Sequence, residues 1–283
     1  MNYKIVSDSS SNVLTMDDPC FVSVPLKIIA QKEYVDDAAC DVAAMVEDLK
    51  KYKGKSGSSC PNVGEWLEAF GDADVVFGVT ISKNLSGSYN AAQQAAQAYM
   101  EANPGKRVHI FDSMSAGPEQ AMLVDKIREL VGMGLPFESI CAQAVEYQNH
   151  THILFCLESL NNLARNGRTS LAVAKLAGVL GIRVVGDAQN GQIVPLHKPR
   201  GAKKATAVLV EMMQERGFYD GALLRVAHCF GDEAAFALRD AVLEKYPNTR
   251  FVLEPTTALC SFYAEAGGLM IGIEGGYNEN NHC

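Results

Sequence analysis

A serine-rich turn at Leu85–Tyr89, with the sequence Leu-Ser-Gly-Ser-Tyr, carries the side chains best placed for chemistry in this chain. It follows an apolar run, Val75–Thr80, and precedes an alanine- and glutamine-rich stretch that favours a helix. The turn therefore delivers the hydroxyls of Ser86 and Ser88 to a helix start, where free backbone N–H groups and the helix dipole suit an anion. Gly87 lets a ligand approach the backbone closely. Ordinary helix capping by a serine explains the same residues.

Similar polar turns recur at four other places along the chain. Two of them, which contain Ser10 and Ser113, come directly after predicted strands. In an open parallel sheet, the loops that follow the strands gather at one edge, where ligands usually bind. Each turn alone also fits a cap, but their repetition favours a site with several donors. The predicted ligand-binding residues are Ser10, Ser58, Ser59, Ser86, Gly87, Ser88, Ser113 and Arg168.

This set of residues favours binding over catalysis. Neutral hydroxyls and one guanidinium hold an oxyanion but offer no general acid or base. Gly54–Ser56 resembles the end of a P-loop, but Leu49 stands where that motif needs its first glycine. Asn84 and Ser88 flank Ser86 where a nucleophile elbow needs glycines. No Cys/His spacing fits zinc, so we predict no metal and no cofactor.

The composition limits the partners. The chain has 283 residues, a net charge of -8 and a pI of about 5.3, which argues against nucleic acid because phosphate binding needs a basic face. We expect no membrane span, because no apolar run reaches about 18 residues. A strand at the very start of the chain argues against a signal peptide. Cysteines within apolar runs, such as Cys156 and Cys229, indicate reduced thiols in a cytoplasmic protein.

The apolar pattern predicts two domains. Strands and helices alternate through residues 1–157, which is typical of a doubly wound, mainly parallel α/β domain, with an inserted hairpin near 20–35. Residues 158–283 predict an α+β sandwich domain, in which Asn190–Gly191 marks a hairpin. The strands are expected at residues 3–6, 75–80, 107–111, 152–156, 183–186, 193–197, 223–229, 250–253 and 269–273. The helices are expected at residues 37–52, 63–70, 89–101, 118–132, 136–149, 201–216 and 232–246.

Six short motifs, spread over nearly the whole chain, resemble the DegV family of bacterial fatty-acid-binding proteins. Leu85–Tyr89 is the most specific, since it resembles the family's Leu-Ser-Gly-Thr-Tyr. The other motifs are Asp-Ser-Ser at 8–10, Ser-Ser-Cys-Pro-Asn-Val-Gly-Glu at 58–65, Asp-Ser-Met-Ser-Ala at 112–116, Asn-Gly-Arg-Thr-Ser at 166–170 and Lys-Pro-Arg-Gly at 198–201.

The resemblance implies a long-chain fatty acid buried between two domains. It implies that hydroxyls at Ser58 and Ser86 hold the carboxylate, with Arg168 as a more distant cation. It also implies a carrier that is not itself an enzyme, and that delivers the acyl chain to a separate fatty acid kinase subunit in phospholipid metabolism.

Two departures from the family pattern bear on the ligand. Cys60 replaces a glutamine beside Ser58. The family's carboxylate-binding histidine falls at Ala264 in the closest register, and no histidine lies between His228 and His282. Losing one hydrogen bond to a buried charge costs ~1.5–3 kcal/mol, or about tenfold to a hundredfold in affinity.

The missing histidine leaves alternatives open. Tyr263, Ser261 or a water would replace it, or the ligand differs from the family's. A binder of, or an enzyme for, a small polar carboxylate or phosphate in the same cleft is therefore the second hypothesis. A regulatory or interaction module is the third, and nothing basic supports DNA binding.

A short basic stretch stands out in this acidic chain. It is usually explained as a solvated helix start, and the alternative is a docking surface for an acidic partner such as the kinase. The stretch consists of Lys198, Arg200, Lys203 and Lys204.

Overall fold

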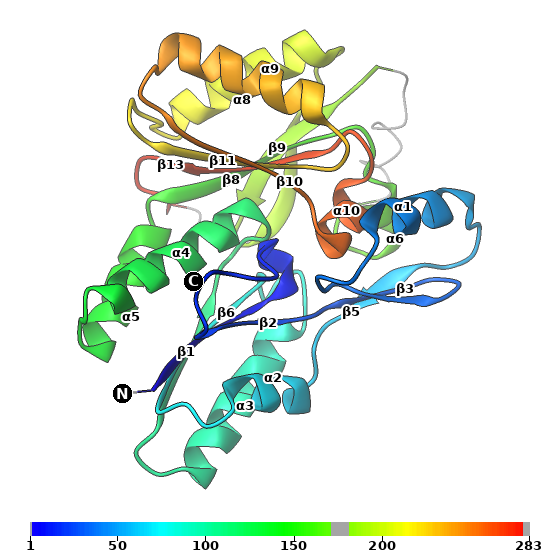
Figure 1. Ribbon diagram of the computed structural model, residues 1–283. Coiled ribbons are helices and arrows are strands. Elements are labelled where there is room, and N and C mark those ends of the chain that lie inside the picture. Colours follow the sequence, from blue (N-terminus) through cyan, green and yellow to red (C-terminus); the bar gives the residue numbers. More distant parts are fainter. Residues whose placement is uncertain (1, 171–180, 280–283) are drawn as a thin grey trace.

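The computed structural model describes residues 2–170 and 181–279. They form two main sheets, with helices on the faces of each (Figure 1). No helix among these residues is long and apolar enough to cross a membrane.

The first sheet is parallel, as the alternation of strands and helices predicted. Its strand order is β2-β1-β6-β7. All six residues of β6 are buried, because helices cover both faces of the sheet. The strands are β1 (Tyr3–Asp8), β2 (Phe21–Val24), β6 (Val75–Thr80) and β7 (Arg107–Asp112).

Two pairs of helices sandwich this sheet. On one face Trp66 and Phe70 pack with Tyr99, and on the other Phe77 stacks on Phe137 with ring centroids 5.1 Å apart. Pro at the first position of α4 favours a helix start. The helices are α2 (Val63–Phe70) and α3 (Ser88–Ala102), then α4 (Pro118–Gly132) and α5 (Phe137–Gln148).

The insertion after β1 differs from the single hairpin predicted near 20–35. Strand β2 joins the main sheet, and only β3 (Lys27–Ile29) and β4 (Glu33–Val35) form a hairpin. That hairpin gains a third strand, β5 (Gly57–Ser59), from a segment predicted as a turn. A strand of three residues is too short for its apolar pattern to reveal its partner.

Helix α1 (Val42–Lys51) begins later than predicted. The carboxylate of Asp41 accepts a hydrogen bond of 2.9 Å from the backbone N–H of Ala44 and so caps the helix. Asp37 instead lies in the preceding turn, where its carboxylate accepts from Ala39.

The second sheet has six strands in the order β10-β9-β8-β13-β11-β12, and only β11 and β12 pair in parallel. The predicted hairpin joins β9 to β10, and its two turn residues have φ of 50° at Asn190 and 67° at Gly191. The strands are β8 (Thr151–Leu157), β9 (Val184–Gln189), β10 (Gln192–His197), β11 (Leu223–His228), β12 (Arg250–Pro255) and β13 (Leu269–Glu274).

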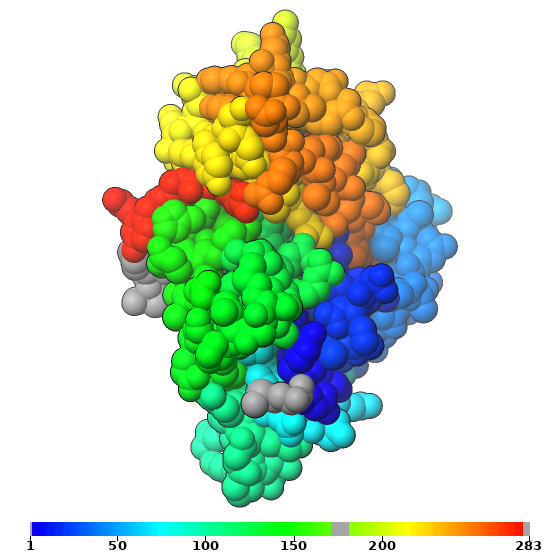
Figure 2. Space-filling view, turned by 60° about the vertical axis from the view of Figure 1, so that its left-hand side comes forward, coloured from blue at the N-terminus to red at the C-terminus, as the bar shows by residue number. Residues whose placement is uncertain are grey.

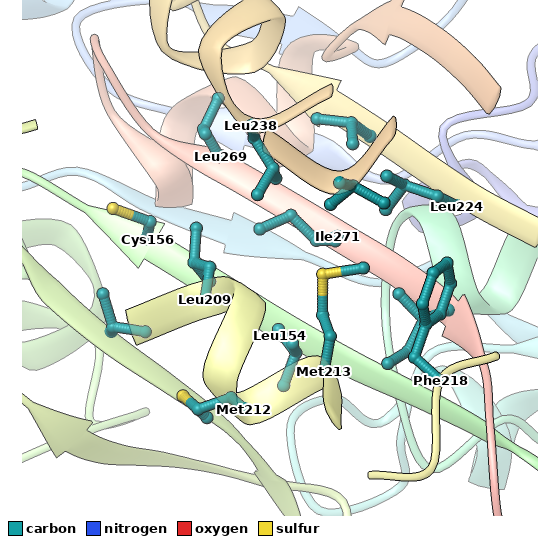
Figure 3. Packing of buried hydrophobic residues seen from close by; sticks show 14 of the residues in the cluster. Leu154, Cys156, Leu209, Met212, Met213, Phe218, Leu224, Leu238, Leu269 and Ile271 are labelled. Atoms are coloured by element: carbon teal, nitrogen blue, oxygen red, sulfur yellow. The ribbon is translucent and has the colours of Figure 1, made fainter. Parts of the chain in front are cut away.

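Helices α8 (Ala202–Glu215) and α9 (Asp232–Lys245) cover one face of this sheet (Figure 1). Figure 3 shows Leu209 and Met213 of α8 packed against Leu154 and Ile271 of the sheet. Among the described residues, the sequence analysis did not predict three short helices: η1 (Ser9–Ser11), α6 (Asn161–Arg165) and α10 (Ala258–Ala264).

Strand β8 belongs to the second sheet, whereas the division at residue 157 placed it in the first domain. It pairs with β13 and β9, both of which follow it in the chain. A continuously apolar sequence indicates that a strand is buried but not which strands it pairs with. The sequence therefore could not show that β8 belongs to the second sheet. The division into two domains stays a prediction.

Helix α4 lies between the two sheets and packs against strands of both (Figure 1). Figure 2 shows the yellow and orange surface of the second sheet's helices above the green surface of α4 and α5. The other face of the second sheet is therefore turned toward the first sheet, and the residues discussed next lie between them.

Candidate functional site

A mostly apolar cavity lies between the two sheets. It encloses about 880 Å³ of space, including the part that is open to solvent. Ile153, Phe155 and Leu157 of β8 line it, because alternate residues of a strand face the same side. Leu26 and Ile81 approach from the first sheet's side. The cavity is thus built from both halves of the chain.

Several polar side chains interrupt this apolar lining, including those of Ser58, Ser86, Tyr263 and Arg168. The Oγ of Ser58 lies 2.7 Å from the hydroxyl oxygen of Tyr263. Each hydroxyl has one proton and the mutual bond uses one of the two. One O–H of the pair therefore stays available to a ligand.

The turn that holds Ser86 is fixed by hydrogen bonds within it. The backbone N–H of Ser86 donates to the carbonyl of Ser82 at 3.1 Å. The Oγ of Ser86 accepts from the backbone N–H of Ser88 at 3.3 Å. Gly87 is the N-cap of α3, so Ser86 satisfies an N–H at the helix start while its own O–H proton remains to donate.

The segment containing Ser58 passes close to this turn. A Cβ atom on Gly87 would lie 3.3 Å from the Sγ of Cys60. The segment of Ser58 and the turn of Ser86, which both line the cavity, therefore pack against each other at Cys60 and Gly87.

Asp8, at the end of β1, holds the turn in place by hydrogen bonds. Its carboxylate is buried and accepts from the backbone N–H of Ile81 at 3.0 Å and from the hydroxyl of Ser88 at 2.6 Å. Ser10 and Gln120 also donate to it. Burial raises the pKa of Asp8, and these hydrogen bonds offset part of that effect.

Arg168 adds a cation beside the same turn. Its Nε donates to the carbonyl of Leu85 at 3.1 Å, and its guanidinium also donates to the carbonyl of Asn166. A guanidinium has five N–H donors, so it can position the backbone next to Ser86 and still bind an anion.

The tip of the β9–β10 hairpin meets the same turn from the second sheet. Ser82 Oγ donates to the carbonyl of Gly191 at 2.7 Å, and Asn84 Nδ2 donates to the carbonyl of Asn190 at 2.7 Å. A Cβ on Gly191 would fall 2.2 Å from Ser82 Oγ. This close approach requires glycine and ties the two sheets together at the site.

Four of the eight predicted ligand-binding residues line the cavity: Ser10, Ser58, Ser86 and Arg168. Ser59 and Gly87 are exposed beside it, and Ser59 alternates with Ser58 along β5. Ser88 is buried under the turn and bonds to Asp8. Ser113 is also buried, and its hydroxyl donates to the carbonyl of Ser115 at 3.1 Å.

Helix α10 supplies Leu259 and Cys260, which the prediction did not place in the site, beside Tyr263 and Ala264, which it had considered at the position of the family's histidine. Leu259, Cys260 and Ala264 line the cavity together with Tyr263. The first turn of α10 faces Asp36. Burial raises the pKa of Asp36 to about 6, and hydrogen bonds from the backbone of α10 offset part of this rise. The hydrophobic residues of this segment gave no strong helical signal because the helix has only seven residues.

The site is rich in hydrogen-bond donors, whereas groups typical of catalysis are few among the described residues. Among the described residues that line the cavity none is a histidine. Burial raises the pKa of Cys260 well above its ordinary value, so its thiol stays protonated. Within residues 2–170 and 181–279 no three His, Cys, Asp or Glu side chains are grouped to hold a metal ion.

Comparisons with known proteins give consistent matches over nearly the whole chain. A family model described as "Uncharacterised protein, DegV family COG1307" matches residues 2–274. A DegV domain-containing protein of Streptococcus gordonii is 38% identical over 280 residues, which cover 97% of this chain and 99% of the relative.

Two similar solved structures contain fatty acids. A DegV family protein from Eubacterium eligens loaded with heptadecanoic acid is 36% identical with a TM-score of 0.94, and the match covers 97% of this chain and 100% of that one. The Streptococcus pneumoniae Fatty Acid Kinase (Fak) B3 protein loaded with linoleic acid is 37% identical, also with a TM-score of 0.94, and the match covers 98% and 100%.

Proposed function

This chain belongs to the DegV family, and from that premise we propose that it binds a long-chain fatty acid in the cavity between its two sheets. The observation that carries the proposal is a mainly apolar cavity between the two sheets, with hydroxyl donors in its lining. Structures of two relatives at 36–37% identity hold heptadecanoic and linoleic acid, which supports the same ligand class here.

The apolar wall supplies the affinity in this proposal. Apolar side chains from both sides of the cavity form this wall: Ile153, Phe155 and Leu157 of β8, Met270 of β13, and Leu26 and Ile81. Burying each CH₂ of an acyl chain stabilises the complex by ~0.8 kcal/mol. A small polar carboxylate would leave most of this wall without a partner, so the cavity favours a long chain over the alternative of a small anion.

The hydroxyls orient the ligand. We assign the carboxylate to the Ser86 O–H and to the free O–H of the Ser58–Tyr263 pair, one for each carboxylate oxygen. Tyr263 thereby replaces the family's histidine, which falls at Ala264, one residue further along α10. Ser261, the other candidate, bonds to Thr256 at 2.7 Å and does not line the cavity. Arg168 contributes a positive charge beside the turn.

A carrier role fits this chemistry better than catalysis does. Ser58, Ser86 and Tyr263 offer O–H groups that can hold a carboxylate, and the described lining of the cavity contains no histidine to act as a base beside it. We therefore propose that the protein presents the acid to a separate kinase subunit, as the name of the pneumococcal relative suggests for that protein. A cytoplasmic location stays a prediction of the sequence.

The ligand carried by the purified protein tests the proposal. We expect native mass spectrometry to detect a complex heavier than the chain by the mass of a long-chain fatty acid, and solvent extraction with gas chromatography to identify that acid. A protein that is empty as purified and takes up no added oleate would overturn the proposal.

A further inference from the structure

Two short helices, α6 and α10, bring polar groups to the cavity. Helix α6 contributes Leu163 to the lining and leads directly to Arg168. Helix α10 contributes Tyr263 and Ala264. The positions of the cation and of one hydroxyl proposed to hold the carboxylate therefore depend on how these two helices are joined.

The two helices are joined by a pair of hydrogen bonds, which we call the α6–α10 contact. The backbone N–H of Asn162, in the first turn of α6, donates to Oε1 of Glu265, the residue that ends α10, at 3.0 Å. The side-chain amide of Asn162 donates to the carbonyl of Phe262 at 2.8 Å. Both bonds satisfy backbone groups that helix ends leave without partners, and Phe262 directly precedes Tyr263.

Further hydrogen bonds connect this contact with Arg168. The carbonyl of Asn162 accepts from the side-chain amide of Asn166 at 2.9 Å. The carbonyl of Asn166 accepts from the guanidinium of Arg168, which also donates to the carbonyl of Leu85 at 3.1 Å. A continuous series of hydrogen bonds therefore runs from the end of α10 through Asn162 to the cation beside the serine turn.

Glu265 has a backbone conformation that favours glycine, with φ of 56° and ψ of 170°. Its neighbours impose this turn: its own N–H donates to the carbonyl of Ser261 at 3.0 Å, and the N–H of Gly267 donates to the carbonyl of Cys229 at 2.8 Å. A glycine would make the same turn with less strain. The turn therefore does not explain why a glutamate stands here, whereas the acceptor that its side chain offers to Asn162 does.

We propose that Glu265 and Asn162 are positioning residues for the ligand, whose contact holds Tyr263 and Arg168 at the spacing that a fatty-acid carboxylate requires. The inference rests on the proposed fatty-acid binding and adds to it two residues that do not themselves line the cavity. In this account the backbone strain at Glu265 lowers the stability of the protein, while its side chain improves ligand binding.

Three variants of Glu265 separate these two effects. Glu265→Gln keeps an acceptor for Asn162, whereas Glu265→Ala and Glu265→Gly both remove it, and only glycine relieves the strain. The glutamine variant should bind oleate within about twofold of the wild type. The alanine and glycine variants should both bind about tenfold more weakly, although the urea midpoint of the glycine variant should lie above that of the alanine variant.

This separation of affinity from stability is the result that a merely structural role would not give. If the glycine variant binds oleate more tightly than the alanine variant, affinity follows stability and the inference is overturned. Equal binding by the wild type and all three variants overturns it too. Phe230→Gly is the matched control, because Phe230 also has a positive φ, of 51°, but is 55% exposed and does not line the cavity. It should leave oleate affinity unchanged.

Asn162→Ala tests the contact from α6 without altering the strained residue, and it decides the matter if the Glu265 variants do not fold. It should weaken oleate binding about tenfold. Its effect should be smaller in an Arg168→Ala protein, since Asn162 acts partly through that cation, and fully additive losses would contradict the proposal. If the wild type binds no oleate, the proposed function fails and this inference fails with it, so the two failures are distinguishable.

Discussion

The hydroxyl oxygens of Ser58 and Tyr263 lie 2.7 Å apart, although 205 residues separate them in the sequence. Ser58 belongs to β5 of the small three-stranded sheet. Tyr263 belongs to the short helix α10, which follows strand β12 of the second sheet. Their contact joins both halves of the chain at the polar part of the cavity. Tyr263 is the neighbour of Ala264, the position that the resemblance assigns to the family's histidine.

The serine of this pair has a matched control in its neighbour. Ser58→Ala should raise the dissociation constant for a long-chain fatty acid about tenfold, because it removes a hydroxyl that orients the carboxylate. Ser59→Ala, one residue along the same strand but exposed, should change it by less than about twofold. Competition with a fluorescent fatty acid measures both. Equal effects of the two substitutions would argue against a specific role for Ser58.

Tyr263→Phe should weaken fatty-acid binding by a similar factor, since it removes the partner of Ser58 and leaves the ring in place. Tyr219→Phe is the control, because Tyr219 is 52% exposed and does not line the cavity. In a double-mutant cycle, Ser58→Ala and Tyr263→Phe should couple by about 0.5–3 kcal/mol because the two hydroxyls are in contact. Additive losses would mean that the two hydroxyls act separately.

Asp8→Ala should destabilise the protein strongly. It leaves the buried N–H of Ile81 and the hydroxyl of Ser88 without their acceptor, and each unsatisfied group costs ~1–3 kcal/mol. Urea unfolding should report a loss of more than about 2 kcal/mol, against almost none for the exposed Asp17→Ala. A fully stable Asp8→Ala protein would show that the turn does not depend on this carboxylate.

Glu119 should make stability depend on pH. Burial raises the pKa of its carboxyl to about 7, from an ordinary value of 4.5. The folded protein therefore binds this proton more tightly than the unfolded chain does, and the stabilisation is complete below pH 4.5 and lost as the pH rises toward 7.

Glu119→Gln isolates that contribution. The free energy of unfolding of the wild type, minus that of the variant, should fall by about 1.4 kcal/mol per pH unit between pH 5 and 7. Taking the difference removes the opposite effect of His152, whose pKa burial lowers to about 4. A difference that stays constant or rises with pH would contradict this assignment.

The basic stretch offers a test of partner docking. Arg200 and Lys203 are exposed at the start of α8, away from the cavity lining. Reversing both charges should reduce kinase-dependent formation of acyl phosphate severalfold, because charge complementarity steers association, and should leave fatty-acid affinity unchanged. Loss of both acyl phosphate formation and fatty-acid binding would indicate misfolding. If neither changes, this surface does not take part in docking the kinase.

The sequence revealed those parts of the fold that depend on local signals. Asn190–Gly191 marks its hairpin because the turn needs positive φ at both residues, and Pro118 marks the start of α4. The pairing of β8 with β13 and β9 was missed, since a buried apolar strand looks alike in either sheet.

The candidate site was predictable where serines follow strands, as at Ser86, but not where a contact spans the chain. Nothing near Tyr263 shows that its hydroxyl reaches Ser58.

A crystal structure of this protein with its fatty acid tests the central claim most directly. The account predicts tubular density along Ile153 and Phe155, with the carboxylate oxygens within hydrogen-bond distance of the hydroxyls of Ser86 and of the Ser58–Tyr263 pair. A carboxylate bound away from these hydroxyls, or a cavity that holds only a small polar anion, would contradict it.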